Sequence, residues 1–366
     1  MIFLKSKKLI LATIFFILSI PAVHTIGQNG TWLNKPIISD NWDWITHNSI
    51  IEVDNNGNII IAGGTSSKTY PLKNPFDSRT NFEFDRGFIT KFSSTGEMLW
   101  SSYIGEGKET RIVDFKIDES NNIILTGQTS AHTSEYYSSQ DYKEGTAEPN
   151  DGYNIFVTNI TSTGRVEWFT IIGGKQMDYP TDLELDNSQN AIVVGELSSP
   201  SFPITNPQST TQDEDIAHPV MLKIGSNGSI IFSTYLSYLG DFSPQKIDFD
   251  QENNLILLGS KYMENFYLMK LNSSYNLMWT TTVLTGIDYS EFFNDMLVDN
   301  SSNVYLFGTV ANEDRQTTYT DYEGSYISYD YDQYLIKVNN TGTIEWEKIL
   351  GGIESEEGVC MTINSN

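Results

Sequence analysis

Acidic and amide side chains recur in this sequence in the alternating order that calcium loops use. Asp54, Asn56 and Asn58 are spaced as successive oxygen ligands of such a loop. The glycine is misplaced, however, and no glutamate follows where a bidentate ligand would close the loop. We therefore interpret the carboxylate as a cap on the backbone amides of a turn and predict no cofactor, with calcium as the alternative.

No other residues have the spacing of a catalytic or metal centre. The histidines, His24, His47, His132 and His218, are scattered without the pair spacing of zinc ligands. The turns STGEMLW, STGRVEW and NTGTIEW resemble the tryptophan-docking motif of quinoprotein propellers but lack its upstream alanine and aspartate. Sialidase-type Asp boxes need an aspartate and one residue fewer between glycine and tryptophan. We predict no catalytic residue.

Tyrosines gather with acidic residues in two variable segments, residues 131–152 and 311–331. Tyrosine beside carboxylates suits contact with sugar rings, a cation or a basic protein, whereas flexible decoration of a sheet edge is the alternative. We expect both segments to be loops that project from the same face of the protein. The predicted binding residues are Tyr136, Tyr137, Tyr142, Tyr319, Tyr322, Tyr326 and Tyr329.

An internal repeat defines the elements that must position these residues. Five times an aspartate precedes a glycine by nine residues, with an apolar run between them. The pairs are Asp54/Gly63, Asp118/Gly127, Asp186/Gly195, Asp250/Gly259 and Asp299/Gly308. Their spacing along the chain indicates stacked supersecondary units that are buried by their neighbours.

Each repeat has a second half, in which a polar residue precedes a large aromatic residue by nine positions. The pairs are Lys91/Trp100, Asn159/Trp168, Lys223/Phe232, Lys270/Trp279 and Lys337/Trp346. A turn lies between them, with glycine at the position where a tight hairpin with a bulge needs positive φ. Tyr275 replaces that glycine in the fourth repeat. We expect the aromatic residues to form the core between repeats.

The two halves together predict four antiparallel strands per repeat and no long helix, which is typical of a propeller blade. The predicted fold is therefore an all-β propeller of four-stranded blades, in five complete repeats plus the first strand of a sixth. We expect the first strand of each repeat to be innermost and its last apolar residue to be deeply buried. Those residues are Val53, Ile117, Leu185, Phe249 and Val298.

The segments GGTSSKTYPLKNPF and ELSSPSFPITNPQS, with the endings YIGEG, IIGGK and ILGGI, resemble the SBBP repeat of bacterial β-propeller proteins. The resemblance covers residues 45–366, although the second, fourth and fifth repeats lack the aromatic-proline element. It implies a propeller on secreted or surface proteins, and it implies no catalytic residues.

The repeats predict blades at residues 45–107, 108–175, 176–240, 241–288 and 289–353, with a partial repeat at 354–366. GVCMTINSN aligns with SIIEVDNN, so the sequence stops inside the turn of a sixth repeat. Residues 26–44 contain NGTWLNKPI, which resembles a fourth strand and is a candidate for closing the ring. We interpret the chain as the N-terminal portion of a longer reading frame, and an irregular five-bladed ring is the alternative.

Residues 1–25 have a basic start, an apolar run and small residues near the end, as a secretory signal peptide does. The apolar run is shorter than a spanning helix needs, and an uncleaved anchor is the alternative. The single cysteine, Cys360, excludes an intrachain disulfide framework. The sequence thus predicts a secreted or cell-surface protein with no membrane insertion beyond the signal segment.

The formal net charge of −25 argues against nucleic acid or anionic lipid as a partner, because both would be repelled. A non-enzymatic module that binds extracellular carbohydrate or protein, within a longer surface protein, fits these features best. The alternative is an extracellular propeller enzyme, of hydrolase, lyase or quinoprotein-like type, with its site in the central channel.

Overall fold

The structure is a computed structural model and describes residues 49–81, 85–105, 109–131, 142–143, 152–173, 176–198, 218–240, 242–261, 265–285, 292–320, 325–352 and 360–362. The predicted signal peptide and the segment 26–44 lie outside these residues. The described chain is all-β, with one short 3-10 turn, η1 (Ser237–Leu239), and no α-helix. Among the described residues there is accordingly no helix able to span a membrane.

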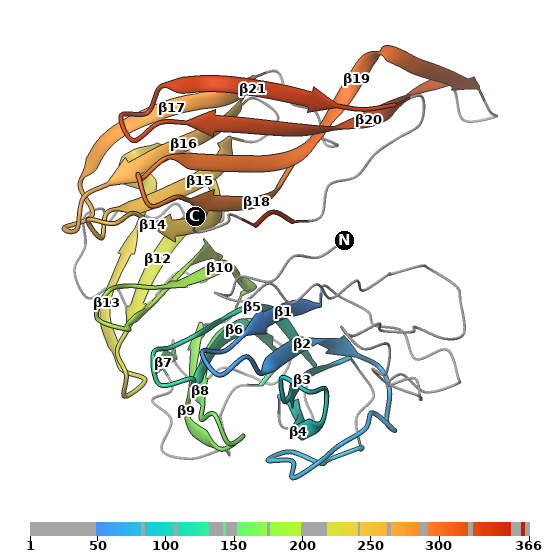
Figure 1. The fold of residues 1–366 in the computed structure, drawn as a ribbon, viewed down its shortest axis with the longest axis vertical. Coiled ribbons are helices and arrows are strands. Elements are labelled where there is room, and N and C mark those ends of the chain that lie inside the picture. Colours follow the sequence, from blue (N-terminus) through green and yellow to red (C-terminus); the bar gives the residue numbers. More distant parts are fainter. Residues whose placement is uncertain are drawn as a thin grey trace. The chain divides into compact units, whose positions relative to one another are not determined.

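The chain divides into two compact units, residues 1–240 and 241–366, and each is described by itself (Figure 1). Unit 1 holds three sheets whose strands follow one another in chain order. The first has β1 (Ile50–Val53), β2 (Ile59–Thr65), β3 (Arg86–Phe92) and β4 (Met98–Ile104). The second has β5 (Thr110–Ile117), β6 (Ile123–Thr129), β8 (Asn154–Ile160) and β9 (Val166–Gly173), with the two-residue β7 (Tyr142–Lys143) parallel to β9. The third has β10 (Asp178–Leu185), β11 (Ala191–Leu197), β12 (His218–Ile224) and β13 (Ile230–Tyr235).

Unit 2 holds the fourth and fifth sheets, again in chain order. The fourth has β14 (Ser243–Phe249), β15 (Leu255–Lys261), β16 (Asn265–Leu271) and β17 (Leu277–Thr285). The fifth has β18 (Phe292–Val298), β19 (Val304–Thr320), β20 (Ser325–Val338) and β21 (Ile344–Leu350). All five sheets thus have the antiparallel four-strand order of a propeller blade, and each falls inside one of the five predicted ranges.

The hairpin between the third and fourth strands has the geometry that its glycine predicts. Gly96, Gly164, Gly228 and Gly342 all have φ between 82° and 85°, and the strand register shifts by a bulge beside each turn. Tyr275 adopts φ 62° in the fourth sheet. A tyrosine can therefore form this turn, although positive φ is costly for a residue with a Cβ.

In four of the sheets, the glycine nine residues after the repeat aspartate faces an irregularity of the neighbouring first strand. In the second sheet the register of β5 shifts between Ile112 and Asp114, directly opposite Gly127. A Cβ on Gly127 would lie 2.1 Å from the Arg111 carbonyl oxygen. Gly195 would meet the Tyr179 carbonyl oxygen at 2.0 Å in the same way.

The fourth and fifth sheets repeat this arrangement. Gly259 pairs with Pro244 and Gly308 pairs with Phe293, and each partner stands directly before a register shift of its strand. A Cβ on Gly259 would lie 2.6 Å from the Ser243 carbonyl oxygen, and a Cβ on Gly308 would lie 2.2 Å from that of Phe292. In these four sheets only glycine leaves room for the backbone of the bulged first strand.

Gly63 departs from this pattern. The pairing of β1 with β2 begins at Ile50 opposite Ala62, so β1 does not reach Gly63. Gly63 is instead buried in β2 opposite Phe88 of β3. The bulge that accounts for the other four glycines therefore does not account for Gly63 within the described part of the first sheet.

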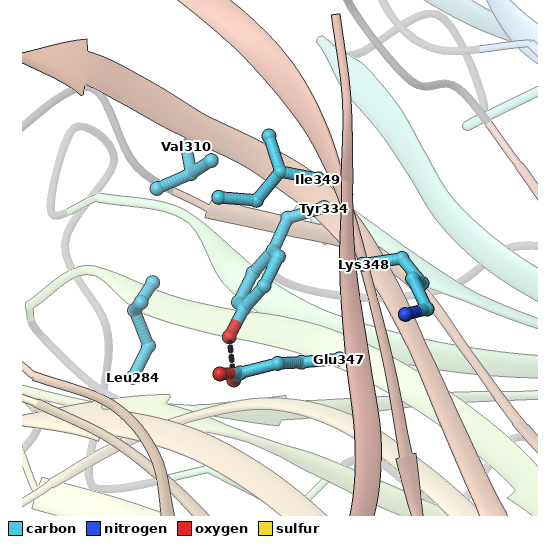
Figure 2. Close-up of a pocket in the computed structure, with 6 residues that line it drawn as sticks. All are labelled: Leu284, Val310, Tyr334, Glu347, Lys348 and Ile349. Atoms are coloured by element: carbon cyan, nitrogen blue, oxygen red, sulfur yellow. Dashed lines mark hydrogen bonds between the residues drawn. The ribbon is translucent and has the colours of Figure 1, made fainter. Parts of the chain in front are cut away.

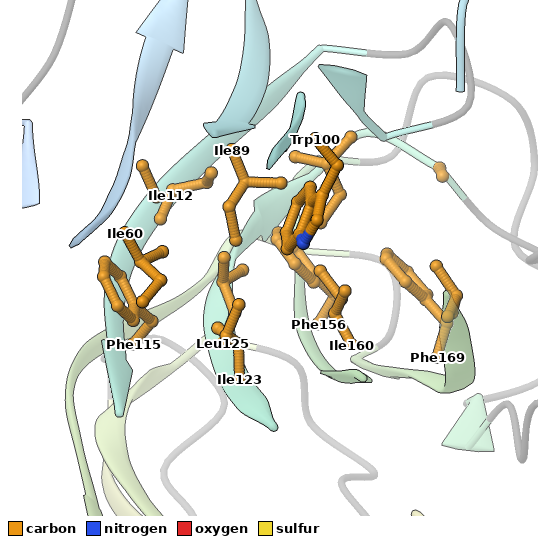
Figure 3. Packing of buried hydrophobic residues seen from close by; sticks show 14 of the residues in the cluster. Ile60, Ile89, Trp100, Ile112, Phe115, Ile123, Leu125, Phe156, Ile160 and Phe169 are labelled. Carbon is orange, nitrogen blue, oxygen red and sulfur yellow. The ribbon is translucent and has the colours of Figure 1, made fainter. Parts of the chain in front are cut away.

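Each unit has its core between neighbouring sheets. Side chains of the first and second sheets form one cluster, in which Ile89 and Trp100 pack with Phe115, Leu125 and Phe156 (Figure 3). The second and third sheets share another cluster, and the fourth and fifth sheets share a third. Within each unit, every sheet buries its apolar side chains against a neighbouring sheet, so each repeat depends on the adjacent repeat for its core.

The aromatic residue of the fourth strand is not equally buried in every sheet, contrary to the expectation of a uniform core. Trp100 and Trp168 are buried in the clusters between sheets, and Phe232 is buried opposite Lys223 in the third sheet. Trp279 and Trp346 in unit 2 are only half-buried. The core role thus holds for the aromatic residues of unit 1 and only in part for those of unit 2.

The prediction that the last apolar residue of each first strand is deeply buried was wrong. Val53, Ile117, Leu185, Phe249 and Val298 are all half-buried. In four of the sheets the residue two positions earlier, on the same face of the strand, is buried instead, namely Phe115, Leu183, Ile247 and Met296. The apolar contacts between sheets stop before the end of each first strand, because the residue after the strand is the repeat aspartate, which begins the turn.

The first strands of neighbouring sheets nevertheless lie against each other within each unit, β1 and β10 against β5 and β14 against β18. In unit 2 the Val298 amide donates to Asp248 Oδ2 at 2.9 Å. In the segment predicted to begin a sixth repeat, the Met361 amide donates to Asp295 Oδ2 at 2.6 Å. Side-chain carboxylates of one first strand therefore hold the backbone of the next.

Side-chain contacts attach the aromatic-proline element of the first repeat to its own sheet. Arg86 and Asp77 form a fully buried ion pair, with Nη2 and Oδ2 2.5 Å apart. The Tyr70 ring lies tilted against that of Phe88, with ring centroids 4.5 Å apart, and its hydroxyl lies 2.9 Å from the Thr90 hydroxyl. These contacts hold the segment against its sheet although it contains no strand.

Candidate binding surfaces

The repeat aspartates cap turns and hold a buried lysine. Asp54 Oδ1 accepts the amides of Asn56 and Asn58, at 2.9 and 2.8 Å, and Oδ2 accepts the Asn58 side-chain amide at 2.8 Å. Lys91 Nζ lies 2.9 Å from the same Oδ2. Both carboxylate oxygens are thus occupied by protein donors, which leaves this group no coordination site to offer a cation.

The same ion pair forms in the third and fourth sheets, between Lys223 and Asp186 at 2.7 Å and between Lys270 and Asp250 at 2.6 Å. Burial alone would raise the pKa of these aspartates, but hydrogen bonds from the lysine and from the turn asparagine outweigh it. The pKa values of Asp54, Asp186 and Asp250 therefore lie below their ordinary value. Within the described residues, no three histidine, cysteine, aspartate or glutamate side chains are placed to hold a metal ion.

The second and fifth sheets depart from this pairing. Asn159 occupies the lysine position beside Asp118, and its buried Oδ1 accepts no hydrogen bond. In the fifth sheet Lys337 pairs with Glu345 at 2.9 Å, while Asp299 accepts the Tyr305 hydroxyl at 3.3 Å. In the sequence, the lysine of this ion pair is the polar residue nine positions before the large aromatic residue of the repeat. The sequence analysis did not connect that lysine with the repeat aspartate.

The fourth-strand tryptophans join neighbouring sheets through one recurrent contact. Trp100, Trp168 and Trp279 donate their indole N–H to a backbone oxygen in the hairpin turn of the next sheet. The acceptors are Ser162, Ser226 and Asn340, at 3.1, 2.7 and 3.3 Å. The glycine two residues after each acceptor lies on the indole ring, where a Cβ would approach ring carbons to between 2.7 and 2.9 Å.

Phe232 breaks this series in the third sheet. It occupies the tryptophan position of β13, where it pairs with Lys223 of β12 and is 8% exposed. A phenyl ring has no N–H, so this strand cannot donate the hydrogen bond that the indoles make. Phe232 is therefore buried as a tryptophan would be, as the sequence suggested, but it does not replace the hydrogen bond of the indole.

A charged cluster on the first strands of unit 1 was missed by the sequence analysis. Lys116 Nζ of β5 lies 3.0 Å from Asp114 Oδ2 and 3.7 Å from Glu184 Oε2 of β10. Burial lowers the pKa of Lys116, but the carboxylates of Asp114, Glu184, Asp182 and Glu52 raise it more, so its pKa lies well above the ordinary value. A lysine in this state remains protonated at neutral pH and serves as a cation, not as a nucleophile.

This cluster occupies alternate positions of the first strands, opposite the apolar face that packs into the core. The signal in the sequence was the recurrence of charge two and four residues before the repeat aspartate. Ile50 in the first repeat and Leu297 in the fifth interrupt that pattern, which is why it did not stand out.

The two tyrosine-rich segments differ in the structure. Tyr136, Tyr137 and Tyr322 lie outside the described residues, and Tyr142 belongs to β7, where it pairs with Ile172 of β9. The expected loop at 311–331 is instead a hairpin, because β19 and β20 continue far beyond their sheet (Figure 1). The two segments belong to different units, so the expectation that they share a face stays a prediction.

Within the described part of the chain, no strand flanks the extension of this hairpin. β18 pairs with β19 only as far as Thr309, and β21 pairs with β20 only from Gln333 onward. Beyond these points Val310–Thr320 and Ser325–Asp332 pair only with each other, and this two-stranded part is here called the ribbon. Its register places Tyr319 opposite Tyr326 and Gln316 opposite Tyr329.

A hollow of about 440 Å³ lies in unit 2 between the fourth and fifth sheets. Its lining residues are Leu284, Val310, Tyr334, Glu347, Lys348 and Ile349. Figure 2 shows the Tyr334 hydroxyl directed at Glu347, to which it donates a hydrogen bond of 2.5 Å. Burial and the neighbouring Glu347 carboxylate raise the pKa of Tyr334, so its phenol stays neutral. The Tyr334–Glu347 pair therefore places hydrogen-bond acceptors at one edge of the hollow.

The repeat residues that the sequence singled out belong to the framework and not to these surfaces. The five glycines and Phe232 lie inside strands of the four-stranded sheets, and none of them lines the hollow or belongs to the ribbon. Those glycines are Gly63, Gly127, Gly195, Gly259 and Gly308.

A scan against protein-family models gave no match to this sequence, and a search of curated proteins gave none either. Solved structures of similar arrangement include a protein of unknown function from Bacteroides caccae, 11% identical, with TM-score 0.42 and coverage of 92% of this chain and 93% of that one. A protein from Lactobacillus plantarum is 11% identical, with TM-score 0.43 and coverage of 96% and 97%.

The extracellular domain assigned to a one-component system of B. thetaiotaomicron is also 11% identical, with TM-score 0.31, and covers 94% of this chain and 48% of that one. At these identities and TM-scores, the similarities carry no information about ligand or activity. The resemblance to the SBBP repeat stays a prediction.

Proposed function

We propose that this protein is a non-enzymatic recognition module that acts outside the cell and binds carbohydrate or protein through its tyrosine-rich ribbon. The observation that carries the proposal is the continuation of β19 and β20 beyond the four-stranded part of their sheet. Only the base of this extension meets the core, where Val310 packs against the apolar cluster of unit 2, so stability alone does not account for the strands beyond it.

The composition of the ribbon suits recognition. Tyr319, Tyr326, Tyr329 and Tyr331 are distributed over its two strands, and Asp330 and Asp332 lie among them. Tyrosine offers a large amphipathic contact area with few rotatable bonds, and carboxylates accept hydrogen bonds from sugar hydroxyls or from basic side chains. A paired backbone holds these residues in fixed register, which lowers the entropic cost of binding.

The repeat aspartates and Lys116 are engaged in structural contacts, which supports a structural over a catalytic role for these groups. The repeat aspartates cap turns, and Lys116 is held protonated among carboxylates. The extracellular location rests on the basic and apolar pattern of residues 1–25. The net charge of −25 favours neutral or basic ligands over nucleic acid.

The test is a ribbon-trimmed variant in which residues 312–330 are replaced by an Asn-Gly turn, a two-residue connection that joins the paired residues Ala311 and Tyr331. The melting temperature should change little, because the strand pairs of the four-stranded part are kept. Binding on a glycan array and in pull-downs from cell-surface extracts should be lost. Trimming residues 132–141 provides the control for loss of a second tyrosine-rich segment.

Equal binding by the trimmed and the unaltered protein would contradict the proposal. So would a trimmed protein that binds nothing but has also lost its cooperative thermal transition, because the ribbon would then be part of the fold.

A further inference from the structure

Trp346 is the last tryptophan of the repeat. The strand surface around it resembles three strand surfaces that other parts of this chain cover. Trp100, Trp168 and Trp279 are each covered by the hairpin turn of the following sheet. Trp346 occupies the same position in β21. Its ring contacts Tyr305 at 6.2 Å between centroids, and among the described residues its indole N–H has no hydrogen-bond acceptor.

The residues beside Trp346 confirm that this face of β21 lacks the usual cover. Leu350 is 52% exposed, whereas the residues at its position in the first three sheets, Ile104, Ile172 and Leu236, are completely buried. Strand alternation places Trp346, Lys348 and Leu350 on one face of β21 and Ile349 on the other. Figure 2 shows the Lys348 side chain on the opposite side of the strand from that of Ile349.

A second recurrent hydrogen bond identifies the role of Lys348. Two positions after Trp168 and Trp279, Thr170 and Thr281 donate their hydroxyls to the carbonyl oxygens of Gly228 and Gly342. Lys348 stands at that position in β21, with an ammonium group that can donate to the same kind of acceptor. The docking face of β21, meaning Trp346, Lys348 and Leu350, is therefore complementary to a hairpin turn with a glycine at positive φ.

One turn of this kind is the first in the chain. The β3–β4 turn carries Gly96 at φ 85°, the value found for Gly342, and Ser94 stands two residues before it, as Ser162 stands before Gly164. No described tryptophan donates to the Ser94 carbonyl. The turn also presents the Glu97 carboxylate, which lies 3.4 Å from Lys73 Nζ and whose side chain is 73% exposed. A carboxylate there adds attraction for the Lys348 ammonium.

We propose that the docking face of β21 binds the β3–β4 turn of a second copy of this chain. Trp346 then donates its indole N–H to the Ser94 carbonyl, and Lys348 donates to the Gly96 carbonyl and attracts Glu97. The docking face of β21 and the β3–β4 turn are different surfaces, so the interface is head to tail. Its small area makes it a weak and concentration-dependent contact.

The test is sedimentation velocity of the full chain over a range of concentrations, with three variants and one control. Trp346→Ala and Lys348→Glu disrupt the docking face of β21. Gly96→Asn disrupts the β3–β4 turn as its partner, because asparagine tolerates positive φ but adds a Cβ where the indole would lie. Ile349→Ser is the control, since Ile349 is 60% exposed on the other face of the same strand.

The wild type and Ile349→Ser should associate equally, and each of the other three variants should weaken association by about tenfold or more. An equimolar mixture of Trp346→Ala and Gly96→Asn should form one-to-one dimers and nothing larger, because only one productive interface remains. A wild type that stays monomeric throughout would overturn the proposal, as would variants that associate normally while circular dichroism shows them folded.

Discussion

Trp168 donates its indole N–H to the backbone oxygen of Ser226 at 2.7 Å, and so joins the fourth strand of one sheet to a hairpin turn of the next. Gly228 lies on the same indole ring, where a Cβ would come within 2.9 Å of Cδ2. The tryptophan and the glycine, which recur separately in the sequence, are therefore the two halves of one contact between sheets.

This contact predicts that Gly228→Ala is more destabilising than positive φ alone would cause. Gly228 has φ 82° and Gly57 has φ 78°, but a Cβ on Gly57 meets only the Ser94 Cβ, at 3.5 Å. We expect Gly57→Ala to lower the free energy of unfolding by about 1–2 kcal/mol and Gly228→Ala by about 3 kcal/mol. Urea unfolding of both variants measures the difference, and equal losses would show that the indole contact contributes nothing.

The buried ion pairs predict a graded loss of stability. Lys91→Met should leave the Asp54 carboxylate buried without its cation and lower the free energy of unfolding by about 3–5 kcal/mol. Lys223→Met should cost clearly less, because the Lys223 side chain is 22% exposed and that of Lys91 only 2%. The two variants are compared by urea unfolding at neutral pH, and a larger loss for Lys223→Met would contradict the assignment.

The lowered aspartate pKa values predict a loss of stability in acid. Because the folded-state pKa lies below the ordinary value, these carboxylates stabilise the fold fully above about pH 4, and the effect is lost as the pH falls through the folded-state pKa. The melting temperature should therefore fall steeply below about pH 4. Asp250→Asn should be less stable at neutral pH and show a shallower fall in acid. An unchanged acid profile in that variant would argue against the pair.

The second sheet predicts a substitution that stabilises. Asn159→Lys places a lysine beside Asp118, as in three other sheets, and removes a buried Oδ1 that accepts no hydrogen bond. We expect a gain of about 1 kcal/mol in the free energy of unfolding. Differential scanning calorimetry of the variant provides the measurement, and a lower melting temperature would mean that the site has no room for the longer side chain.

The repeat made most of the fold predictable, because each fixed spacing corresponds to a strand or a turn. The turn glycine at Gly96 and the bulge beside it follow from local chemistry, and local chemistry is what a single sequence reveals best. The strand order within each sheet follows from the same spacing, since short connections join antiparallel neighbours.

The binding surfaces were harder to predict, because they depend on contacts between distant residues. The pairing of Lys91 with Asp54 joins two elements that no local pattern connects. The segment 311–331 was interpreted as a loop because it is a variable segment rich in tyrosine and acidic residues, although TTYT and YISY are typical strand sequences. Burial at the ends of the first strands was overestimated because the sequence pattern does not show where packing between sheets stops.

The most direct test of the proposed function is binding by a ribbon variant that keeps the hairpin intact. Tyr319→Ser combined with Tyr326→Ser removes one cross-strand pair, and Thr317→Ala combined with Ser328→Ala alters the pair next but one as a control. On a glycan array and in surface pull-downs, the tyrosine variant should lose binding by about tenfold or more while the control binds as the wild type does. Undiminished binding by the tyrosine variant, at an unchanged melting temperature, would contradict the account.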